Sequence, residues 1–337
     1  MRISLSLLCL MVFGAALTCA AEDEMKIGGV GFLRYSTTED DDNAAFDAPD
    51  DFDIFDVKIY IKGSLDNEFS YKALYSVRQS TLWDAFVKYS PDGLPLNVTL
   101  GQFKVPFSLA GLALACPAPL QETIRGVRIY EAHPGSPVAN PRVGPRDIGL
   151  KLDGDLLEGK LGWSLGVYNG TGINADDDND QKDVCAAVTV SPLKGSGSPL
   201  AGLSFGGAYW AGHQPAAAPL ENGRDRYSAF LKYSQEELDI RAEYIAQNRE
   251  RTGDDMETTN WYLQASYKVT PEVGVVARYQ QYDPDGEADD DAEDIVTVGV
   301  NWYVGERVTL RANYNLYEEE GTDVDNNELI IQVDVKF

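Results

Sequence analysis

Hydrophobic and polar side chains alternate along most of the chain. At the C-terminus, apolar residues occupy every second position from Leu329 to Phe337, and polar residues such as Gln332 and Asp334 occupy positions between them. Because neighbouring side chains of a β-strand point to opposite faces, this alternation predicts strands with one apolar and one polar face. The pattern begins near residue 25 and recurs up to the last residue.

Sixteen segments carry the alternation, and most have close to the ~9–11 residues of a membrane-spanning strand. They are residues 25–36, 52–63, 67–77, 82–90, 96–106, 146–153, 160–168, 183–191, 201–213, 226–234, 237–249, 258–269, 272–283, 294–304, 306–318 and 326–337. Tight polar turns, such as Pro91-Asp92-Gly93 and Thr270-Pro271, mostly alternate with longer charged connections. Short turns at one rim and long loops at the other are typical of a closed antiparallel barrel.

Two all-β folds share this alternation, a soluble sandwich and a membrane-spanning barrel. The barrel is favoured because Tyr and Trp gather near the strand ends of the apolar face, as in the aromatic girdles of membrane proteins. Polar or charged side chains occupy the other face in nearly every strand. We therefore expect a transmembrane antiparallel β-barrel of about 16 strands, formed by residues 22–337 as a single outer-membrane domain.

The N-terminus has the features of a secretory signal peptide. Arg2 gives a positive start, an apolar stretch runs from Leu5 to Leu17, and Ala20 and Ala21 are small residues suited to cleavage. We place the signal peptide at residues 1–21. Beyond it, no run approaches the ~20 apolar residues of a membrane helix, so a helical membrane protein is excluded. The expected location is the outer membrane of a Gram-negative bacterium.

Two of the four cysteines would remain in the mature chain. Cys9 and Cys19 fall within the predicted signal peptide, whereas Cys116 and Cys185 would lie in an oxidising compartment. They either form a disulfide or remain two unpaired small residues, and the sequence leaves both possibilities open.

The chain of 337 residues has a net charge of −26 and a pI near 4.3, which opposes binding to nucleic acid. The acidic residues gather in predicted long loops. These loops are residues 37–51, 169–182, 250–257, 283–293 and 318–325. Either they form a rim that loosely binds divalent cations and bridges through them to lipopolysaccharide phosphates, or they are only solvated loops.

No dedicated cofactor, metal or catalytic site is expected. Asp176, Asp178 and Asp180 have the spacing of an EF-hand loop, but Gln181 stands where glycine is needed. The histidines, His133 and His213, both lie in predicted loops, and no Ser-His-Asp set is evident. We therefore expect that the protein is not an enzyme.

Bases outnumber acids on the polar phase that would face the lumen. The bases in this phase are Arg34, Lys58, Lys62, Lys72, Arg78, Lys88, Lys151, Lys160, Arg226, Lys232, Arg241, Lys268, Arg278, Arg307, Arg311 and Lys336. The acids are Asp56, Glu68, Asp84, Asp147, Asp183, Asp239, Glu243, Glu328 and Asp334. This excess predicts a positive lumen despite the negative chain.

The longest connection, residues 107–145, joins the fifth and sixth predicted strands, and a loop of this length is usually functional. The bases of this segment and its two ends, which we assign to an anion-binding constriction, are Lys104, Arg125, Arg128, Arg142 and Arg146. A ring of bases selects anions, and the planar fork of arginine suits phosphate and carboxylate. Alternatively, these arginines only tie the loop to wall carboxylates such as Asp147 and Asp84.

Residues 101–109, Gly-Gln-Phe-Lys-Val-Pro-Phe-Ser-Leu, resemble the strand-to-constriction-loop motif of the phosphate-selective porin O/P family. Residues 146–152 and 166–170 give weaker support. Phe337 is similar to the C-terminal aromatic residue that the barrel-assembly machinery recognises. In layout the resemblance covers most of the mature chain, but its specific motifs cover only residues 101–109 and 146–170.

The resemblance implies an outer-membrane channel, often trimeric, whose third long loop folds into the lumen. The best-known members of that family pass phosphate or polyphosphate. The implied partners are small anionic solutes such as phosphate, outer-membrane lipid and lipopolysaccharide, the barrel-assembly machinery, and two further copies of the chain. The arginine ladders of the family cannot be mapped onto this sequence residue by residue.

We expect a channel for passive diffusion of small hydrophilic solutes that favours anions. Two alternatives stay open. A general or cation-tolerant porin is one, since acidic loops would concentrate cations at the mouth. The other is a surface adhesion or envelope-tethering protein that uses its acidic loops and has a plugged barrel.

Overall fold

The computed structural model describes residues 25–38, 50–113, 146–177, 179–213, 223–250, 255–289, 291–321 and 326–337. The predicted signal peptide therefore lies outside the described residues. So do residues 39–49 of the first acidic loop and residues 114–145 of the long insertion. Cys116, Arg125, Arg128 and Arg142 belong to this second group.

The described chain forms sixteen strands and one short helix, α2 (Leu109–Ala113). The strands are β1 (Lys26–Thr38), β2 (Asp51–Leu65), β3 (Phe69–Ser76), β4 (Thr81–Tyr89), β5 (Asn97–Lys104), β6 (Arg146–Leu156), β7 (Leu161–Tyr168), β8 (Asp183–Val190), β9 (Leu203–Ala211), β10 (Arg224–Gln235), β11 (Leu238–Arg249), β12 (Met256–Lys268), β13 (Val273–Asp283), β14 (Glu293–Val304), β15 (Val308–Glu319) and β16 (Glu328–Lys336). Their bounds lie within three residues of the predicted segments. The predicted all-β fold is confirmed.

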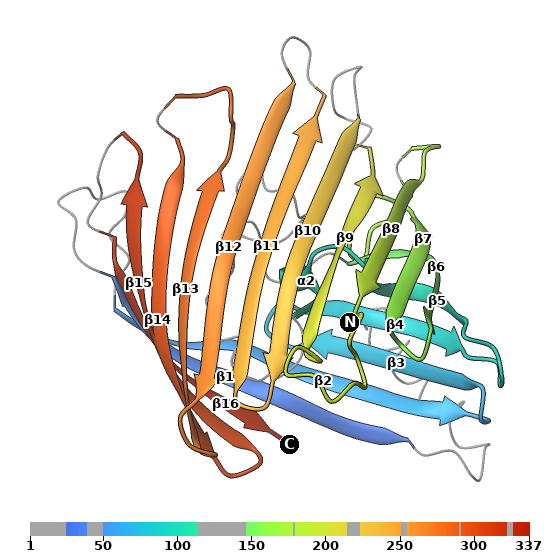
Figure 1. The fold of residues 1–337 in the computed structure, drawn as a ribbon, viewed down its shortest axis with the longest axis horizontal. Helices are drawn as coiled ribbons and strands as arrows, with labels where there is room; N and C mark the ends of the chain where they lie inside the picture. The colour runs from blue at the N-terminus through green and yellow to red at the C-terminus, as the bar shows by residue number, and fades with distance from the viewer. Residues whose placement is uncertain are drawn as a thin grey trace, which may run out of the picture.

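Each strand pairs antiparallel with its sequence neighbours, and β16 pairs with β1 to close the barrel (Figure 1). Val333 of β16 lies opposite Leu33 of β1, and Phe337 exchanges backbone hydrogen bonds with Gly29. The closure of the barrel, which the sequence predicts, is thus confirmed. No helix among the described residues is long and apolar enough to cross a membrane.

The wall has an apolar outer face and a polar inner face, in the predicted phase. In β16, Ile331 is 41 % exposed, whereas Gln332 and Asp334 are 5 % and 1 % exposed because they point into the narrow lumen. Trp261 and Tyr279 contact each other on the outside of β12 and β13, with ring centroids 5.1 Å apart. Exposed aromatic pairs of this kind form the girdles that hold a barrel at the membrane interfaces.

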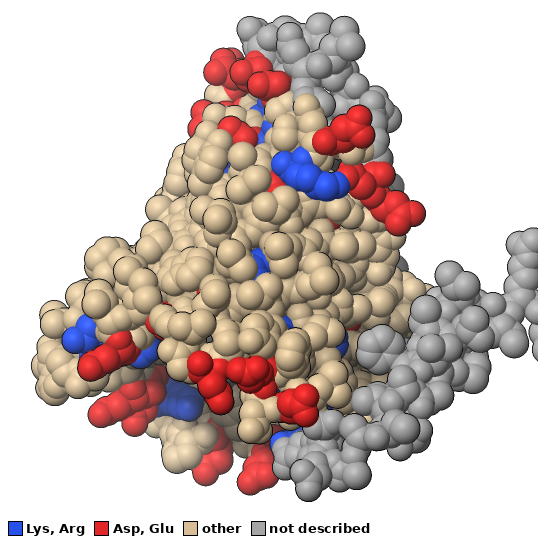
Figure 2. All heavy atoms as spheres, turned by 90° about the vertical axis from the view of Figure 1, so that its right-hand side faces the viewer, with Lys and Arg blue, Asp and Glu red and all other residues tan. Residues whose placement is uncertain are grey.

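Charged atoms gather towards two ends of the molecule and are sparse over the broad surface between them (Figure 2). A charge-poor band between charged ends matches the hydrocarbon layer of a bilayer and its two interfaces.

A β-bulge in β4 alters the inner face in a way that alternation cannot predict. Asp84 pairs with Leu74 and Leu82 pairs with Tyr75, so that Trp83 is the extra residue between them. Trp83 and Asp84 are consequently both buried, at 1 % and 3 % exposure. Bulges often redirect side chains near functional sites. This one places an indole beside a carboxylate at the lumen.

Gly101 in β5 needs to be glycine for two reasons. Its φ of 126° lies in the left-handed region, and a Cβ there would lie 2.2 Å from the carbonyl oxygen of Ala85. We expect Gly101→Ala to lower the free energy of unfolding by at least about 1–3 kcal/mol, because strained backbone and a backbone clash coincide. Gly31→Ala is the matched control, because a Cβ at Gly31 would meet nothing within 4 Å. Urea unfolding in lipid vesicles measures both, and equal stability of the two variants would contradict the close approach of β5 to β4.

Candidate pore constriction

After β5 the chain leaves the wall and turns into the lumen. The Phe107 N–H donates to the Val105 carbonyl oxygen at 2.7 Å, which makes a sharp turn. Ser108 then begins helix α2, with a φ of 67°, and its Oγ accepts a hydrogen bond from the Gly111 N–H at 3.1 Å. A serine side chain that binds an N–H of the first turn is a typical helix N-cap. The long connection that the sequence predicts as a loop therefore begins with a short helix.

Glu243 on the inner face of β11 holds this segment. Its carboxylate accepts hydrogen bonds from the backbone N–H groups of Leu109 at 2.5 Å and Ala110 at 2.9 Å. It also accepts bonds from the hydroxyls of Ser108 at 3.3 Å and Tyr262 at 3.1 Å. Glu243 is only 3 % exposed, so these four donors replace the water that a buried carboxylate would otherwise require. The segment that leaves β5 thus contacts the wall six strands away.

An apolar cluster packs beneath the same segment. It consists of Phe103, Val105, Phe107, Tyr168, Cys185, Trp210, Ile245, Tyr262 and Tyr282. Phe107 meets Trp210 edge to face, with ring centroids 5.7 Å apart. Cys185 is a free, fully buried thiol, and its predicted alternative partner Cys116 lies outside the described residues. The cluster removes water from part of the lumen and fixes the course of residues 103–110.

A second segment, residues 170–174, bends inward after β7. The Gly170 N–H donates to Asp147 at 2.8 Å, and Asn174 exchanges two hydrogen bonds with Gln102 of β5. Ile173 packs against Leu74 and Trp83. Its conformation requires the positive φ of Gly170, Gly172 and Asn174. From the sequence alone, residues 169–182 are predicted only as an acidic loop.

The two described residues of the predicted anion-binding constriction have close partners. The Arg146 guanidinium donates to Asp84 at 2.7 Å and lies 4.8 Å from the centre of the Trp83 ring. Lys104 donates to the backbone carbonyls of Gly111, at 3.1 Å, and Leu112. Arg146 therefore makes the wall contact that the alternative interpretation predicted, and Lys104 helps to hold α2. Arg125, Arg128 and Arg142 lie outside the described residues.

The bases that are predicted to line the lumen differ in their exposure and in the groups that they contact. Lys58 is 7 % exposed and lies 4.1 Å from the centre of the Trp83 ring, and Lys72 pairs with Asp84 at 2.7 Å. Arg311 is buried and pairs with Asp334 at 2.6 Å. Two further ion pairs join Lys151 to Asp153 and Arg78 to Asp53. Lys62 is exposed near the end of β2 that leads into the short turn to β3, and Lys88 is half-buried in β4.

Three arginines gather where β10 begins and β11 ends. Arg224 lies directly opposite Arg249 in the register, and Arg226 follows two residues after Arg224 on the same face. Arg226 is 1 % exposed and stacks on Trp210, with the guanidinium 4.0 Å from the ring centre. The alternation along the sequence places Arg226 on the lumen side but does not single out Arg224 and Arg249. Arg224 precedes the predicted segment 226–234, and its inclusion depends on where the strand begins.

The acidic rim is described only in part. In the connection between β13 and β14, the pKa of Asp291 is raised above its usual value by desolvation and by the nearby carboxylates of Asp283 and Asp285. Neighbouring carboxylates of this kind repel one another. Across the described residues, no group of three or more His, Cys, Asp or Glu side chains could hold a metal ion.

A closed barrel with an apolar outer wall, a polar inner face and a chain segment anchored inside it defines an outer-membrane channel. A family model described as Gram-negative porin matches residues 6–334, and the chain belongs to that family. Family and fold point to a channel of the outer membrane rather than to an enzyme. No curated protein is significantly similar to this chain in sequence.

Solved porin structures share the fold at low sequence identity. Salmonella typhi OmpF in complex with daunomycin has a TM-score of 0.68 and 10 % identity over 94 % of this chain and 98 % of that chain. An anion-selective porin from Comamonas acidovorans has a TM-score of 0.64 and 15 % identity over 94 % and 99 %. The trimer form of OmpT, an outer membrane protein of Vibrio cholerae, has a TM-score of 0.65 and 10 % identity over 94 % and 100 %.

Proposed function

We propose that this porin passes small hydrophilic solutes by passive diffusion and prefers anions, with phosphate-like solutes as the expected class. The observation that carries the preference is a row of bases across the inner face of β10–β13. Lys232 lies opposite Arg241 in the register, Arg241 opposite Gln264, and Gln264 opposite Arg278. The hydrogen-bonded register thus aligns three cations on one stretch of wall.

The position of this row makes its charge effective. Arg241 and Arg278 are each 6 % exposed, so water screens them far less than it screens the acidic loops at the rim. Asp239 is the carboxylate paired with Arg241, at 2.5 Å. Arg224, Arg226 and Arg249, at the start of β10 and the end of β11, add further positive charge to the same part of the wall. Together these residues favour anions along one side of the lumen.

The long insertion belongs to the same proposal. Its first residues are anchored to Glu243, which supports an inward course for the whole segment 107–145. Arg125, Arg128 and Arg142 would then add to the constriction with Lys104 and Arg146. The anion-selective porin among the similar structures supports the sign of the preference, and the trimeric OmpT form supports a homotrimer.

A general or cation-tolerant porin is the second candidate, and lumen carboxylates favour it. Asp56, Asp147, Asp183 and Glu243 are each 3 % exposed or less on the inner side of the wall. Several are capped by hydrogen bonds from backbone N–H groups, which spread but do not cancel their charge. The two candidates differ in the sign of ion selectivity.

Neutralising the row tests the proposal. We expect Lys232→Gln combined with Arg278→Gln to shift the reversal potential in a potassium chloride gradient towards cations and to weaken block of chloride current by phosphate. Arg307→Gln is the control, because Arg307, which the alternation assigns to the lumen, is exposed in the short turn between β14 and β15. A row variant with the reversal potential of the wild type would remove these residues from the selectivity mechanism.

A further inference from the structure

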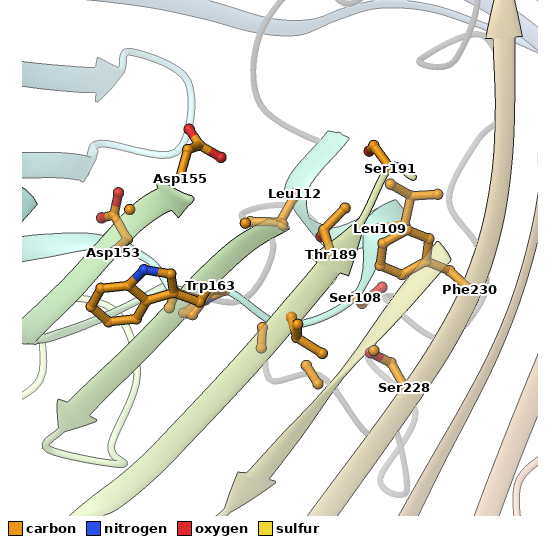
Figure 3. Close-up of a pocket in the computed structure, with 18 of the residues that line it drawn as sticks. Ser108, Leu109, Leu112, Asp153, Asp155, Trp163, Thr189, Ser191, Ser228 and Phe230 are labelled. Carbon is orange, nitrogen blue, oxygen red and sulfur yellow. The ribbon is translucent and has the colours of Figure 1, made fainter. Parts of the chain in front are cut away.

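A cavity of about 400 Å³ lies inside the barrel between helix α2 and the wall formed by β6–β10 (Figure 3). Its size falls in the range of ~300–1,000 Å³ that is typical of small-molecule sites. Pro106, Leu109 and Leu112 line it on the side of α2. The opposite side belongs to the wall, between the anchored segment and the rim of short turns.

The wall side of the cavity follows two adjacent rows of the sheet register. The first row runs through Asp153, Ser164, Ala187, Ala208 and Ser228. The second row runs through Asp155, Gly162, Thr189, Gly206 and Phe230. Each row begins with a carboxylate, continues through small side chains and ends at β10. The small residues in the middle leave the hollow, and the larger ones close its ends.

Three hydroxyl groups on the wall of the cavity are available to a ligand. Ser164, Thr189 and Ser228 line the cavity, and within the described chain their side chains form no hydrogen bond. Ser228 is 7 % exposed, so its hydroxyl has little access to water except through the cavity (Figure 3). Ser164 and Thr189 are half-buried, and none of the three hydroxyl oxygens is closed off from the cavity, so that water in the cavity can bind them. A bound solute with its own hydroxyls would replace this water.

The charges around the cavity favour a neutral ligand. Lys151 pairs with Asp153 at 3.0 Å, and Lys194 lines the cavity together with Asp155, so that two bases offset two carboxylates. An anion would meet two carboxylates here. By contrast, the apolar side chains of α2 and the Phe230 ring suit the C–H surface of a sugar, and the hydroxyls and carboxylates suit its O–H groups.

We propose that this cavity is a binding site for a neutral polyhydroxylated solute of mono- or disaccharide size, placed along the permeation path. This proposal goes beyond the anion preference, because none of the three cations Lys232, Arg241 and Arg278 lines the cavity, and Lys151 and Lys194 offset its two carboxylates. The porin would then pass two classes of solute by different contacts: anions along the basic wall, and sugars through the hydroxylated hollow beneath α2.

Sucrose block of the ion current tests the site. In planar bilayers, we expect sucrose to lower the conductance of the wild-type porin in a saturable way. Polyethylene glycol of similar size should lower it only in proportion to bulk conductivity. Thr189→Val with Ser228→Ala removes two hydroxyls at nearly constant volume and should raise the half-blocking concentration about tenfold, from the loss of two hydrogen bonds. Ala187→Leu should fill the hollow and abolish saturable block.

Thr309→Val is the matched control, because Thr309 is a buried, inward-facing threonine of β15 on another part of the wall. It should leave the half-blocking concentration unchanged. Equal, non-saturable effects of sucrose and polyethylene glycol on the wild type would overturn the proposal. So would block that survives in both cavity variants when heat-modifiable gel mobility shows that they are folded. The reversal potential, measured in the same bilayers, reports the anion preference separately.

Discussion

Replacing Val298 by arginine is expected to lower the free energy of unfolding by about 2–4 kcal/mol, the cost of a cation near the middle of the lipid-facing wall of a barrel. Val298 stands near the middle of β14, is 47 % exposed and belongs to the outward phase of that strand, whereas its neighbour Thr297 is 1 % exposed. The arginine could not reach the lumen without reversing the strand. Equilibrium unfolding in vesicles measures the change.

Val304→Arg supplies the control for depth. Val304 shares the outward phase and is 40 % exposed, but it ends β14 at the rim of short turns. There the same substitution should cost only about 0–1 kcal/mol, because the side chain reaches the interface. Similar costs at the two positions would contradict either the membrane-spanning assignment or the phase of the strand.

Loss of the Glu243 carboxylate is expected to release the segment that begins the long insertion. Glu243→Ala would leave two backbone N–H groups and two hydroxyls without their acceptor, and each buried donor left unsatisfied costs about 1–3 kcal/mol. Water would then enter between α2 and β11. We expect a higher and noisier single-channel conductance together with a lower midpoint of thermal unfolding.

Two further variants separate this anchoring from charge. Glu328→Ala removes another buried carboxylate of the inner face, one that binds Asn315. It should shift selectivity towards anions, as Glu243→Ala also should, but without channel noise. Glu243→Gln keeps one acceptor oxygen and should lie between wild type and alanine. Quiet channels in Glu243→Ala would show that the segment holds its position without this carboxylate.

The barrel could be predicted from the sequence because each strand shows its own alternation of apolar and polar residues. Alternation from Leu329 to Phe337 shows both that β16 is a strand and which face meets lipid, and the register to β1 follows from closure. The bulge at Trp83 was not accessible, because one extra residue leaves the alternation of β4 almost unchanged while it turns an indole inward. The course of residues 170–174 likewise depends on Gln102 and Asp147, far away in the sequence.

Only part of the site could be predicted from the sequence. Residue type and alternation placed Arg241, Arg278 and Glu243 on the inner face, but neither shows which side chains form ion pairs or hydrogen bonds with one another. Arg146 and Asp84 are 62 residues apart in sequence and form an ion pair only because β4 and β6 flank β5. The anchoring role of Glu243 arises from a helix start that belongs to a different part of the chain. Pairings of this kind are fixed by the closed register and not by local pattern.

The reversal potential of the wild-type porin, measured in a planar bilayer across a potassium chloride gradient at physiological ionic strength, tests the central claim most directly. At this salt concentration the acidic rim is screened within about 8 Å, whereas the bases of the inner wall act at short range on each passing ion. The account predicts an open channel whose reversal potential lies on the chloride side of zero. A reversal potential on the potassium side, or a folded barrel that conducts no current, would contradict it.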